Sequence, residues 1–374
     1  MSLNRIFAVS LIVGAGALAG CGSEPGAIAD QSSAAVVSAA AVHPENPGQK
    51  KFLTVMTRNV YLGADVFAPF QSENPLGTAA QVWADIQASD FPSRAAAIAD
   101  EIVGASPDVV GLQEMYRFVV TPLDPSQPGG QELDFVALLL EELEQRAPGR
   151  YRLAASQAET DLLIPFPSLG VQIRMIDHDV ILADSDVAVG ATSGANYGPR
   201  LEVSLGGLAV TALRGWVSAE IAKERVEATF VNTHLEVREF GPLQGLQTIE
   251  LAQRFASVRP LVLVGDLNSD PTDPPAPFPS YPGGLVPSPY TTLTSFLQDA
   301  WAAAGRGDGF TCCFDADITP PSRPLSERID LVLFAADAKV MDVTRVGLDP
   351  VAFLDGWPSD HAGVVATLRF DAKK

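Results

Sequence analysis

Residues 261–271 read LVLVGDLNSDP, an apolar run that ends at Gly265 and is followed by Asp266, Asn268 and Asp270. The run has the length and composition of a buried strand. An unpaired buried carboxylate is unfavourable, so the acids at this strand end require solvent, a turn or a cation beside them. Taken alone, the motif favours a turn, because Gly, Asn, Asp and Pro are all turn-forming residues.

Other predicted strands carry the same kinds of polar residue at their ends. Strand termini on one edge of a sheet converge, so side chains that are far apart in sequence can form one site. One polar strand end is ordinary turn chemistry, but a repeated set of amides, carboxylates and histidines favours a site for a divalent cation or a phosphate. The set comprises Asn59, Gln113 with Glu114, Asn232 with His234, Asp266 with Asn268, Asp330, and Asp360 with His361.

From Lys51 onward, predicted strands alternate with predicted helices. Because many strands follow one another as hairpins, the pattern predicts an α/β protein with mixed or antiparallel sheets. Helices are predicted from Ser93 to about Gly104, over 132–146 and over 241–257. Strands are predicted over 52–60, 107–115, 151–155, 179–183, 201–205, 209–221, 226–236, 260–266, 328–335, 338–346 and 361–370.

The Pro-rich stretch 271–290 is predicted to be a surface loop, with a lid beside the site as one role. A linker between two domains is the alternative.

Cys312 and Cys313 are adjacent, so they cannot join distant segments of the chain. They could form a vicinal disulfide or pack as two thiols, and both alternatives stay open. A zinc site is disfavoured, because two adjacent cysteines lack further ligands.

The charge balance bears on the partner. The chain has 45 acidic and 25 basic residues and a net charge of −20. Proteins that hold long nucleic acids present basic surfaces, so long nucleic acid is disfavoured here, although the overall count leaves a local basic groove open. A small phosphoester or a lipid headgroup is easier to reconcile with this charge.

The first residues, MSLNRIFAVSLIVGAGALAGC, have the pattern of a secretory signal. The ending Leu-Ala-Gly-Cys resembles the bacterial lipobox, in which cleavage precedes a cysteine that is then lipidated. We therefore expect a lipoprotein signal peptide at 1–20, a lipidated Cys21, and a flexible tether over 21–50. A plain signal peptide is the alternative. The protein is expected to be exported, anchored by lipid to the bacterial cell envelope, and monomeric.

Six motifs together resemble the endonuclease/exonuclease/phosphatase (deoxyribonuclease-like) superfamily. They are TRNVYLG, VVGLQE, VNTHLE, VGDLN, ERIDLVL and PSDHAGVVATL, and they occur in the family's order over about residues 53 to 370. The resemblance implies a four-layered α/β sandwich, two mixed β-sheets packed face to face with helices outside, as the catalytic domain over 51–374. It also implies a metal-dependent phosphoester hydrolase.

The resemblance further implies a metal site of hard oxygen ligands. Glu114 would be the principal ligand, with Asn59 beside it and Asp360 completing the site. Such ligands suit Mg²⁺, with Mn²⁺ or Ca²⁺ as alternatives.

For the chemistry, the resemblance implies that His361 is the general base and Asp330 its orienting partner. Asp266 and Asn268 would hold the attacking water and a phosphate oxygen, although Asp266 is itself the alternative base. His234 would donate to a phosphate oxygen or to the leaving group, and Arg214 would bind the substrate phosphate, with a surface ion pair as its alternative.

Some positions depart from the family pattern. Many members of the family have Asn-x-Asp after the first strand, whereas this chain has Asn59-Val60-Tyr61, which resembles the start of bacterial sphingomyelinases. The second metal ligand of the pattern is therefore missing at this position. Asp65 could take its place, but a turn role for Asp65 is favoured. Asp179 is the proposed carboxylate partner of His234. Phe70 and the segment 278–290 are candidates for membrane contact.

These features predict hydrolysis of a small or lipid-linked phosphoester. An extracellular nuclease is the alternative within the same chemistry. A surface lipoprotein that keeps the fold as a non-catalytic binding module is the alternative from another class.

Overall fold

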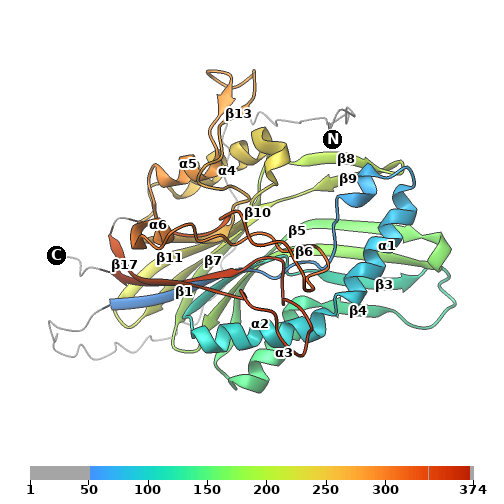
Figure 1. Ribbon diagram of the computed structural model, residues 1–374, viewed down its shortest axis with the longest axis horizontal. Coiled ribbons are helices and arrows are strands. Elements are labelled where there is room, and N and C mark those ends of the chain that lie inside the picture. The colour runs from blue at the N-terminus through green and yellow to red at the C-terminus, as the bar shows by residue number, and fades with distance from the viewer. Residues whose placement is uncertain (1–50, 336, 371–374) are drawn as a thin grey trace, which may run out of the picture.

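Two β-sheets pack face to face in the computed structural model, and helices cover their outer surfaces (Figure 1). The structure describes residues 51–335 and 337–370. The predicted signal peptide, the tether and Cys21 lie outside the described residues. Within the described ranges, no helix is both long enough and apolar enough to cross a bilayer.

The first sheet contains the strand that opens the domain and the strand that closes it. β1 pairs in parallel with β2 and antiparallel with β18. In spatial order the sheet runs β17 (Ala338–Val346), β18 (Gly363–Phe370), β1 (Lys51–Asn59), β2 (Val109–Gln113), β6 (Val171–Asp184), β3 (Arg117–Pro122) and β4 (Gln131–Asp134), and β5 (Tyr151–Phe166) also pairs with β6.

The second sheet contains the LVLVGD segment as a central strand. Its order is β15 (Gln298–Asp299), β16 (Asp330–Phe334), β12 (Leu261–Asp266), β11 (Val226–His234), β10 (Gly215–Lys223) and β7 (Ala188–Asn196). Two small antiparallel pairs lie apart from the main sheets: β8 (Leu201–Leu205) with β9 (Leu208–Ala212), and β13 (Ala276–Pro277) with β14 (Leu285–Val286).

Alternation along the central strands separates the apolar cores. In β12, Val262 and Val264 face the first sheet, whereas Leu261 and Leu263 face α4 on the opposite side. Side chains of a strand alternate between the two faces, so a strand buried on both sides is apolar throughout. The outer layers consist of α1 (Pro75–Ala88), α2 (Phe91–Ala105) and α3 (Phe135–Arg146) on the first sheet, and α4 (Gly241–Phe255) and α5 (Pro289–Thr294) on the second. The short helix α6 (Ala300–Ala304) packs against β16 and β17 and contributes Ala300 and Trp301 to the core between the sheets.

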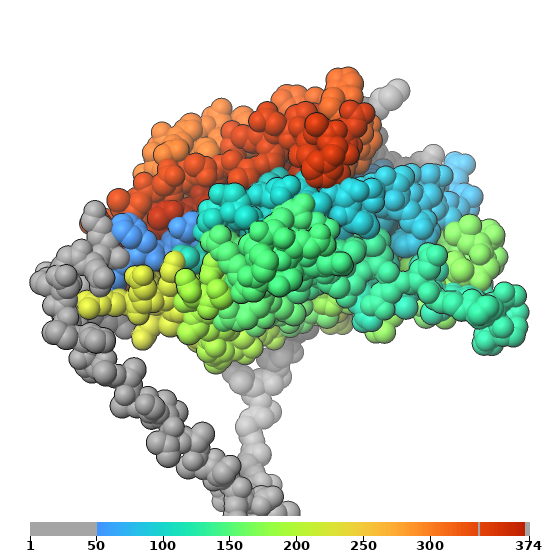
Figure 2. All heavy atoms as spheres, turned by 90° about the horizontal axis from the view of Figure 1, so that it is seen from below, coloured from blue at the N-terminus to red at the C-terminus, as the bar shows by residue number. Residues whose placement is uncertain are grey.

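This arrangement is the predicted four-layered α/β sandwich. Figure 2 shows α2 and α3 side by side on one outer surface, with the C-terminal segment beside them. Arg94 connects α2 to this C-terminal segment, because its Nη1 donates to the Pro358 carbonyl at 3.0 Å.

Several elements differ from the prediction. The first residues predicted for the helix over 132–146 belong to β4, because Gln131–Asp134 pairs with β3 before Asp134 caps α3. The predicted single strand over 209–221 is divided into β9 and β10. The hydroxyl oxygen Oγ1 of Thr160 bonds both the N–H and the carbonyl of Leu213, and this bend separates the two strands. The helix α1 was not predicted.

The Pro-rich stretch forms a projection, as predicted for a surface segment. β13 and β14 make a short hairpin that extends away from the body beside α4 and α5 (Figure 1). Val286 at its base is fully buried and lies against Gly245 of α4. The segment therefore folds back on the second sheet's own helical layer and does not link two domains.

Candidate active site

Strand register aligns four site residues across the second sheet. His234 at the end of β11 lies opposite Asp266 of the parallel strand β12. Asp266 in turn lies opposite Asp330 of the antiparallel strand β16. On the other side, Gly215 is paired with His234, which puts Arg214 directly beside the histidine. The row Arg214, His234, Asp266 and Asp330 thus comes from four adjacent strands.

The first sheet supplies a second set of polar ends that faces this row. Asn59 pairs with Gln113 at the ends of the parallel strands β1 and β2, and Glu114 follows. The Asn59 side-chain amide donates to Glu114 Oε1 at 3.0 Å and to Asp266 Oδ2 at 3.0 Å. Gln113 makes a similar crossing, since its Nε2 donates to Asn232 Oδ1 at 2.6 Å. The predicted strand ends therefore meet where the two sheets face each other.

Gly265 is required for the LVLVGD strand to end this way. Its φ is +152°, and a Cβ at this position would lie 1.9 Å from the Thr233 carbonyl oxygen. A larger residue would push β12 away from β11 and separate Asp266 from His234. Asn268, which follows the strand, has a φ of +48° and its N–H donates to Asp266 Oδ1 at 2.9 Å. The motif is both a turn and part of the site.

His361 and Asp330 form a close pair. His361 Nδ1 lies 2.8 Å from Asp330 Oδ2, which leaves Nε2 available for proton exchange. Burial lowers the pKa of His361, but the carboxylates of Asp330, Asp360 and Asp266 outweigh it and hold that pKa well above its ordinary value. The pair has the geometry of a base with an orienting acid.

His234 has a different environment. Arg214 Nη1 lies 2.9 Å from His234 Nδ1, and a guanidinium can only donate, so Nδ1 accepts and the ring proton is on Nε2. Nε2 lies 3.5 Å from Asp266 Oδ2 and 3.1 Å from the Asn268 amide nitrogen. Burial, Arg214 and His361 all lower the pKa of His234 well below its ordinary value. His234 is therefore a neutral donor.

Asp179 does not have the predicted place beside the His234 ring. Arg214 occupies the Nδ1 position, and neither carboxylate oxygen of Asp179 has a hydrogen-bond partner among the described residues. Asp177 and Asp179 lie two residues apart on β6, so their side chains lie on the same face of the strand. Asp177 Oδ2 lies 3.5 Å from Arg214 Nη1. Arg214 itself is buried and ion-paired, and its predicted contact with substrate remains a prediction.

Sequence reasoning named Asp179 but missed the other buried acids around Arg214. Burial raises the pKa of Asp177 to about 6, and burial together with neighbouring carboxylates raises the pKa values of Glu159 and Asp179 well above their ordinary range. The alternation in IDHDV was the available signal, because it puts Asp177 and Asp179 on one face of the strand. Glu236, after VNTHL, adds a further carboxylate beside Arg214.

Two fully buried arginines hold the loops that carry the site. Arg94 donates to the carbonyls of Val60 at 2.7 Å and Tyr61 at 3.0 Å, just after Asn59. Arg58 donates to the carbonyls of Asn59 and His361 and pairs with Glu101. Since each arginine binds backbone near a site residue, both act through positioning.

The acidic residues present fit a hard divalent cation. Asp360 Oδ1 and Asp330 Oδ1 are buried and have no hydrogen-bond partner among the described residues. Burial raises the pKa of Asp266 to about 7 and that of Asp360 to about 6, as expected for carboxylates that lack a counterion. Asp266, Asp330 and His361 present ligand atoms within 4.8 Å of one another. The predicted ligand Glu114 already accepts from Asn59 and from the Leu62 N–H at 2.7 Å.

Cys312 and Cys313 are paired as a vicinal disulfide beside His361. Cys313 Sγ lies 3.8 Å from His361 Nε2.

Two further acids have structural roles, as predicted for Asp65. Asp65 caps the Phe67 N–H at 2.8 Å, and Asp270 accepts from the Thr272 N–H at 2.9 Å and from the Arg328 N–H at 3.0 Å.

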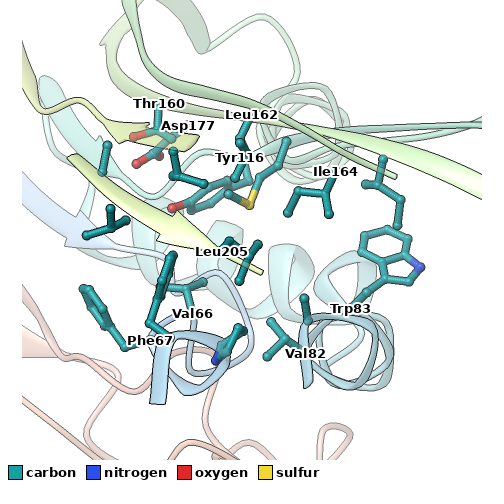
Figure 3. Close-up of a pocket in the computed structure, with 18 of the residues that line it drawn as sticks. Val66, Phe67, Val82, Trp83, Tyr116, Thr160, Leu162, Ile164, Asp177 and Leu205 are labelled. Atoms are coloured by element: carbon teal, nitrogen blue, oxygen red, sulfur yellow. The ribbon is translucent and has the colours of Figure 1, made fainter. Parts of the chain in front are cut away.

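An apolar cleft adjoins the row at Arg214 (Figure 3). Its walls come from α1 and the segment before it, from β5 and β6, and from the β8–β9 pair. Phe70, a predicted membrane-contact candidate, lines this cleft, whereas 278–290 forms the projecting hairpin.

The fold and site together define a two-sheet α/β sandwich with a His/Asp cluster between the sheet edges. The model of the Endonuclease/Exonuclease/phosphatase family matches residues 59–361, so the chain belongs to that family. A comparison with curated protein sequences found no relative.

Solved structures share the fold. An endonuclease/exonuclease/phosphatase from Beutenbergia cavernae DSM 12333 is 22% identical with a TM-score of 0.54, covering 86% of this chain and 72% of its own. A family protein from Bacteroides thetaiotaomicron is 16% identical with a TM-score of 0.53, covering 87% and 98%. TDP2 from D. rerio, complexed with single strand DNA product, is 14% identical with a TM-score of 0.50, covering 85% and 98%.

Proposed function

We propose that this protein hydrolyses phosphoesters with the help of a divalent cation, Mg²⁺ in the first instance. The observation that carries the proposal is the convergence of a neutral histidine, a carboxylate-paired histidine and buried acids at one sheet edge. Glu114, Asp360 and Asn59 would hold the cation. When bound, it would neutralise charge that develops on the phosphoryl oxygens.

The chain's own residues would divide the proton transfers. His361, oriented by Asp330, would accept the proton of the attacking water at Nε2 as the water oxygen bonds to phosphorus. His234 would donate from Nε2 to a phosphoryl oxygen or to the leaving oxygen as the ester P–O bond breaks. Asp266 and Asn268 would orient the water and the phosphate. This division suits an in-line displacement, in which the protein mainly positions and neutralises.

The first test is hydrolysis of bis-p-nitrophenyl phosphate with Mg²⁺, Mn²⁺ or Ca²⁺ and with EDTA. We expect metal-dependent release of p-nitrophenolate that His361→Ala reduces by at least about 10²-fold, the usual size of a general-base contribution. No release from a phosphoester panel with any of these metals would favour the alternative of a non-catalytic binding module.

A small or lipid-linked phosphoester is the proposed substrate class, and a nuclease is the second candidate. The zebrafish TDP2 complex contains single strand DNA product, so the fold accommodates DNA in that protein. For this chain the net charge of −20 argues against a long polyanion. Comparing single-stranded DNA with sphingomyelin and nucleotide phosphoesters separates the two.

Export and lipid anchoring are also proposed, from the signal pattern and Cys21. Expression of the full chain in a bacterium should place the protein in the membrane fraction, and Cys21→Ser should release it. A Cys21→Ser protein that stays with the membrane would contradict the lipid anchor.

A further inference from the structure

The apolar cleft has one apolar body and one polar end. Its cavity volume is about 140 Å³. Figure 3 shows Trp83 and Val82 of α1 on one side, with Leu162 and Ile164 of β5 across from them. Leu205 of β8 closes a further side. The apolar lining matches that of sites for small apolar ligands.

The polar end coincides with the catalytic row. Asp177, Thr160 and Tyr116 lie together in Figure 3, away from Trp83. Arg214 also lines the cleft, and its Nη1 reaches His234 Nδ1 at 2.9 Å. Tyr116 at this end follows the predicted cation ligand Glu114 by two residues, and its N–H donates to the Glu114 carbonyl at 2.9 Å. A phosphoryl group at His234 would thus have one substituent at the mouth of the cleft.

We propose that the cleft binds a single alkyl chain of the phosphoester substrate, which makes the substrate a lipid-like phosphoester. The proposal rests on the proposed function. An alkyl chain needs no hydrogen bonds, and among the described lining residues the body of the cleft offers only the Trp83 indole N–H beyond its Arg214 end. A nucleobase carries several donors and acceptors on its edges, and burying them against Val82, Leu162 and Ile164 would leave them unsatisfied.

The first experiment varies the chain length of the substrate. Methyl alkyl phosphodiesters with ethyl, hexyl, octyl and decyl chains are hydrolysed below their micelle concentrations, and phosphorus NMR follows the monoester product. We expect kcat/KM to rise by roughly three- to fourfold for each added methylene until the cleft is filled. Equal kcat/KM across the series, or a preference for an aromatic substituent, would overturn the proposal.

The second experiment fills the cleft. Val82→Trp should abolish the dependence of kcat/KM on chain length. Ala84→Trp is the matched control, because Ala84 lies on the same helix, is exposed and does not line the cleft. A Val82→Trp protein that keeps the full chain-length dependence, with circular dichroism like the wild type, would contradict the proposal.

A binding measurement separates this inference from the proposed function. A bromine-labelled decyl phosphate, added in EDTA, should quench the fluorescence of Trp83, and Trp83→Phe should remove that component of quenching. Quenching without hydrolysis of any ester would leave the cleft assignment in place and refute the enzyme. Hydrolysis without quenching or chain-length dependence would leave the enzyme and refute the cleft assignment.

Discussion

At the scale of single residues, the two histidines of the site have opposite protonation preferences. Carboxylates hold the pKa of His361 well above its ordinary value despite burial, whereas burial and Arg214 lower that of His234. Residues with pKa values displaced in opposite directions are suited to opposite proton transfers. The sequence motifs contain both histidines, but only the neighbours that folding brings to each one determine which of them is charged.

Asp330→Asn tests the role of the carboxylate beside His361. A base works when unprotonated, so activity should rise with pH through the His361 pKa. Removing Asp330 removes a cause of the raised pKa, so the rising limb should move to lower pH. The maximal kcat should fall by roughly 10²-fold or more, because the ring loses its orienting partner. A pH–rate profile checks both effects, and a rising limb that stays in place would contradict the assigned role.

Gly265→Ala tests whether the strand end requires glycine. The added Cβ would meet the Thr233 carbonyl, which is backbone and cannot move aside. We expect a loss of about 3 kcal/mol or more in the free energy of unfolding by urea, above the usual cost of a left-handed non-glycine residue. Gly284→Ala is the control: its φ is +75° and no atom lies within 4 Å of the new Cβ, so only about 1–2 kcal/mol should be lost. Equal losses would contradict the steric argument.

At the scale of elements, α2 connects the two loops that carry the metal-site residues. Arg94 donates to the carbonyls of Val60, Tyr61 and Pro358, and burial lowers its pKa to about 10, which is still well above neutrality. Asn59 precedes one loop and Asp360 follows the other. The helix thus sets the spacing of the predicted ligands without touching them.

Arg94→Lys keeps the positive charge on α2 and removes the forked guanidinium group with its several N–H donors. A lysine cannot reach the same set of carbonyls, so at least one buried acceptor loses its donor, at a cost of about 1–3 kcal/mol. We expect lower stability and weaker apparent metal affinity in Mn²⁺ titrations of activity. Arg174→Lys is the control, since Arg174 is exposed and pairs with Asp161 at the surface. Unchanged metal affinity in Arg94→Lys would limit the arginine to a stability role.

The elements differ in how well the sequence predicts them. The central strands β2 and β12 are apolar runs, β1 and β11 are rich in β-branched residues, and their ends carry the site residues, so these strands and their polar ends were predictable. The split between β9 and β10 was not, because the segment 209–221 alternates as one strand and the break depends on Thr160, which is remote in sequence. The apolar cleft also escaped prediction, since its walls come from α1, β5 and β8, and no local pattern indicates that they face one another.

At the scale of the whole molecule, the buried acids make the metal-free protein sensitive to pH. Burial raises the pKa of Asp266 to about 7 and those of Asp360 and Asp177 to about 6, from 3.8. The folded state therefore binds more protons than the unfolded state between pH 3.8 and the raised pKa values of the folded state. Their contribution to stability is present below pH 3.8 and is lost as pH rises through the folded-state values. His361, whose pKa is also raised, contributes with the same sign.

We accordingly expect the protein in EDTA to melt at a lower temperature at pH 8 than at pH 5. A pKa difference of one unit corresponds to about 1.4 kcal/mol, so the summed loss should be several kcal/mol. Divalent cation should restore stability mainly at pH 8, where the carboxylates that bind it are ionised. A cation at 100 times its Kd adds about 2.7 kcal/mol. Thermal melts in EDTA and in Mn²⁺ at both pH values measure the difference.

Two variants decide whether the site is the origin of this pH dependence. Asp266→Asn should reduce the fall in melting temperature between pH 5 and pH 8, because the carboxyl group with the most raised pKa of the three is gone. Asp270→Asn should leave the fall unchanged, since hydrogen bonds outweigh burial and lower the pKa of Asp270, so its contribution is lost only under acid conditions. A protein that melts equally at both pH values in EDTA would show that the acids of LVLVGDLN are stabilised without a cation. The segment LVLVGDLNSDP would then form a turn and not a part of a metal site.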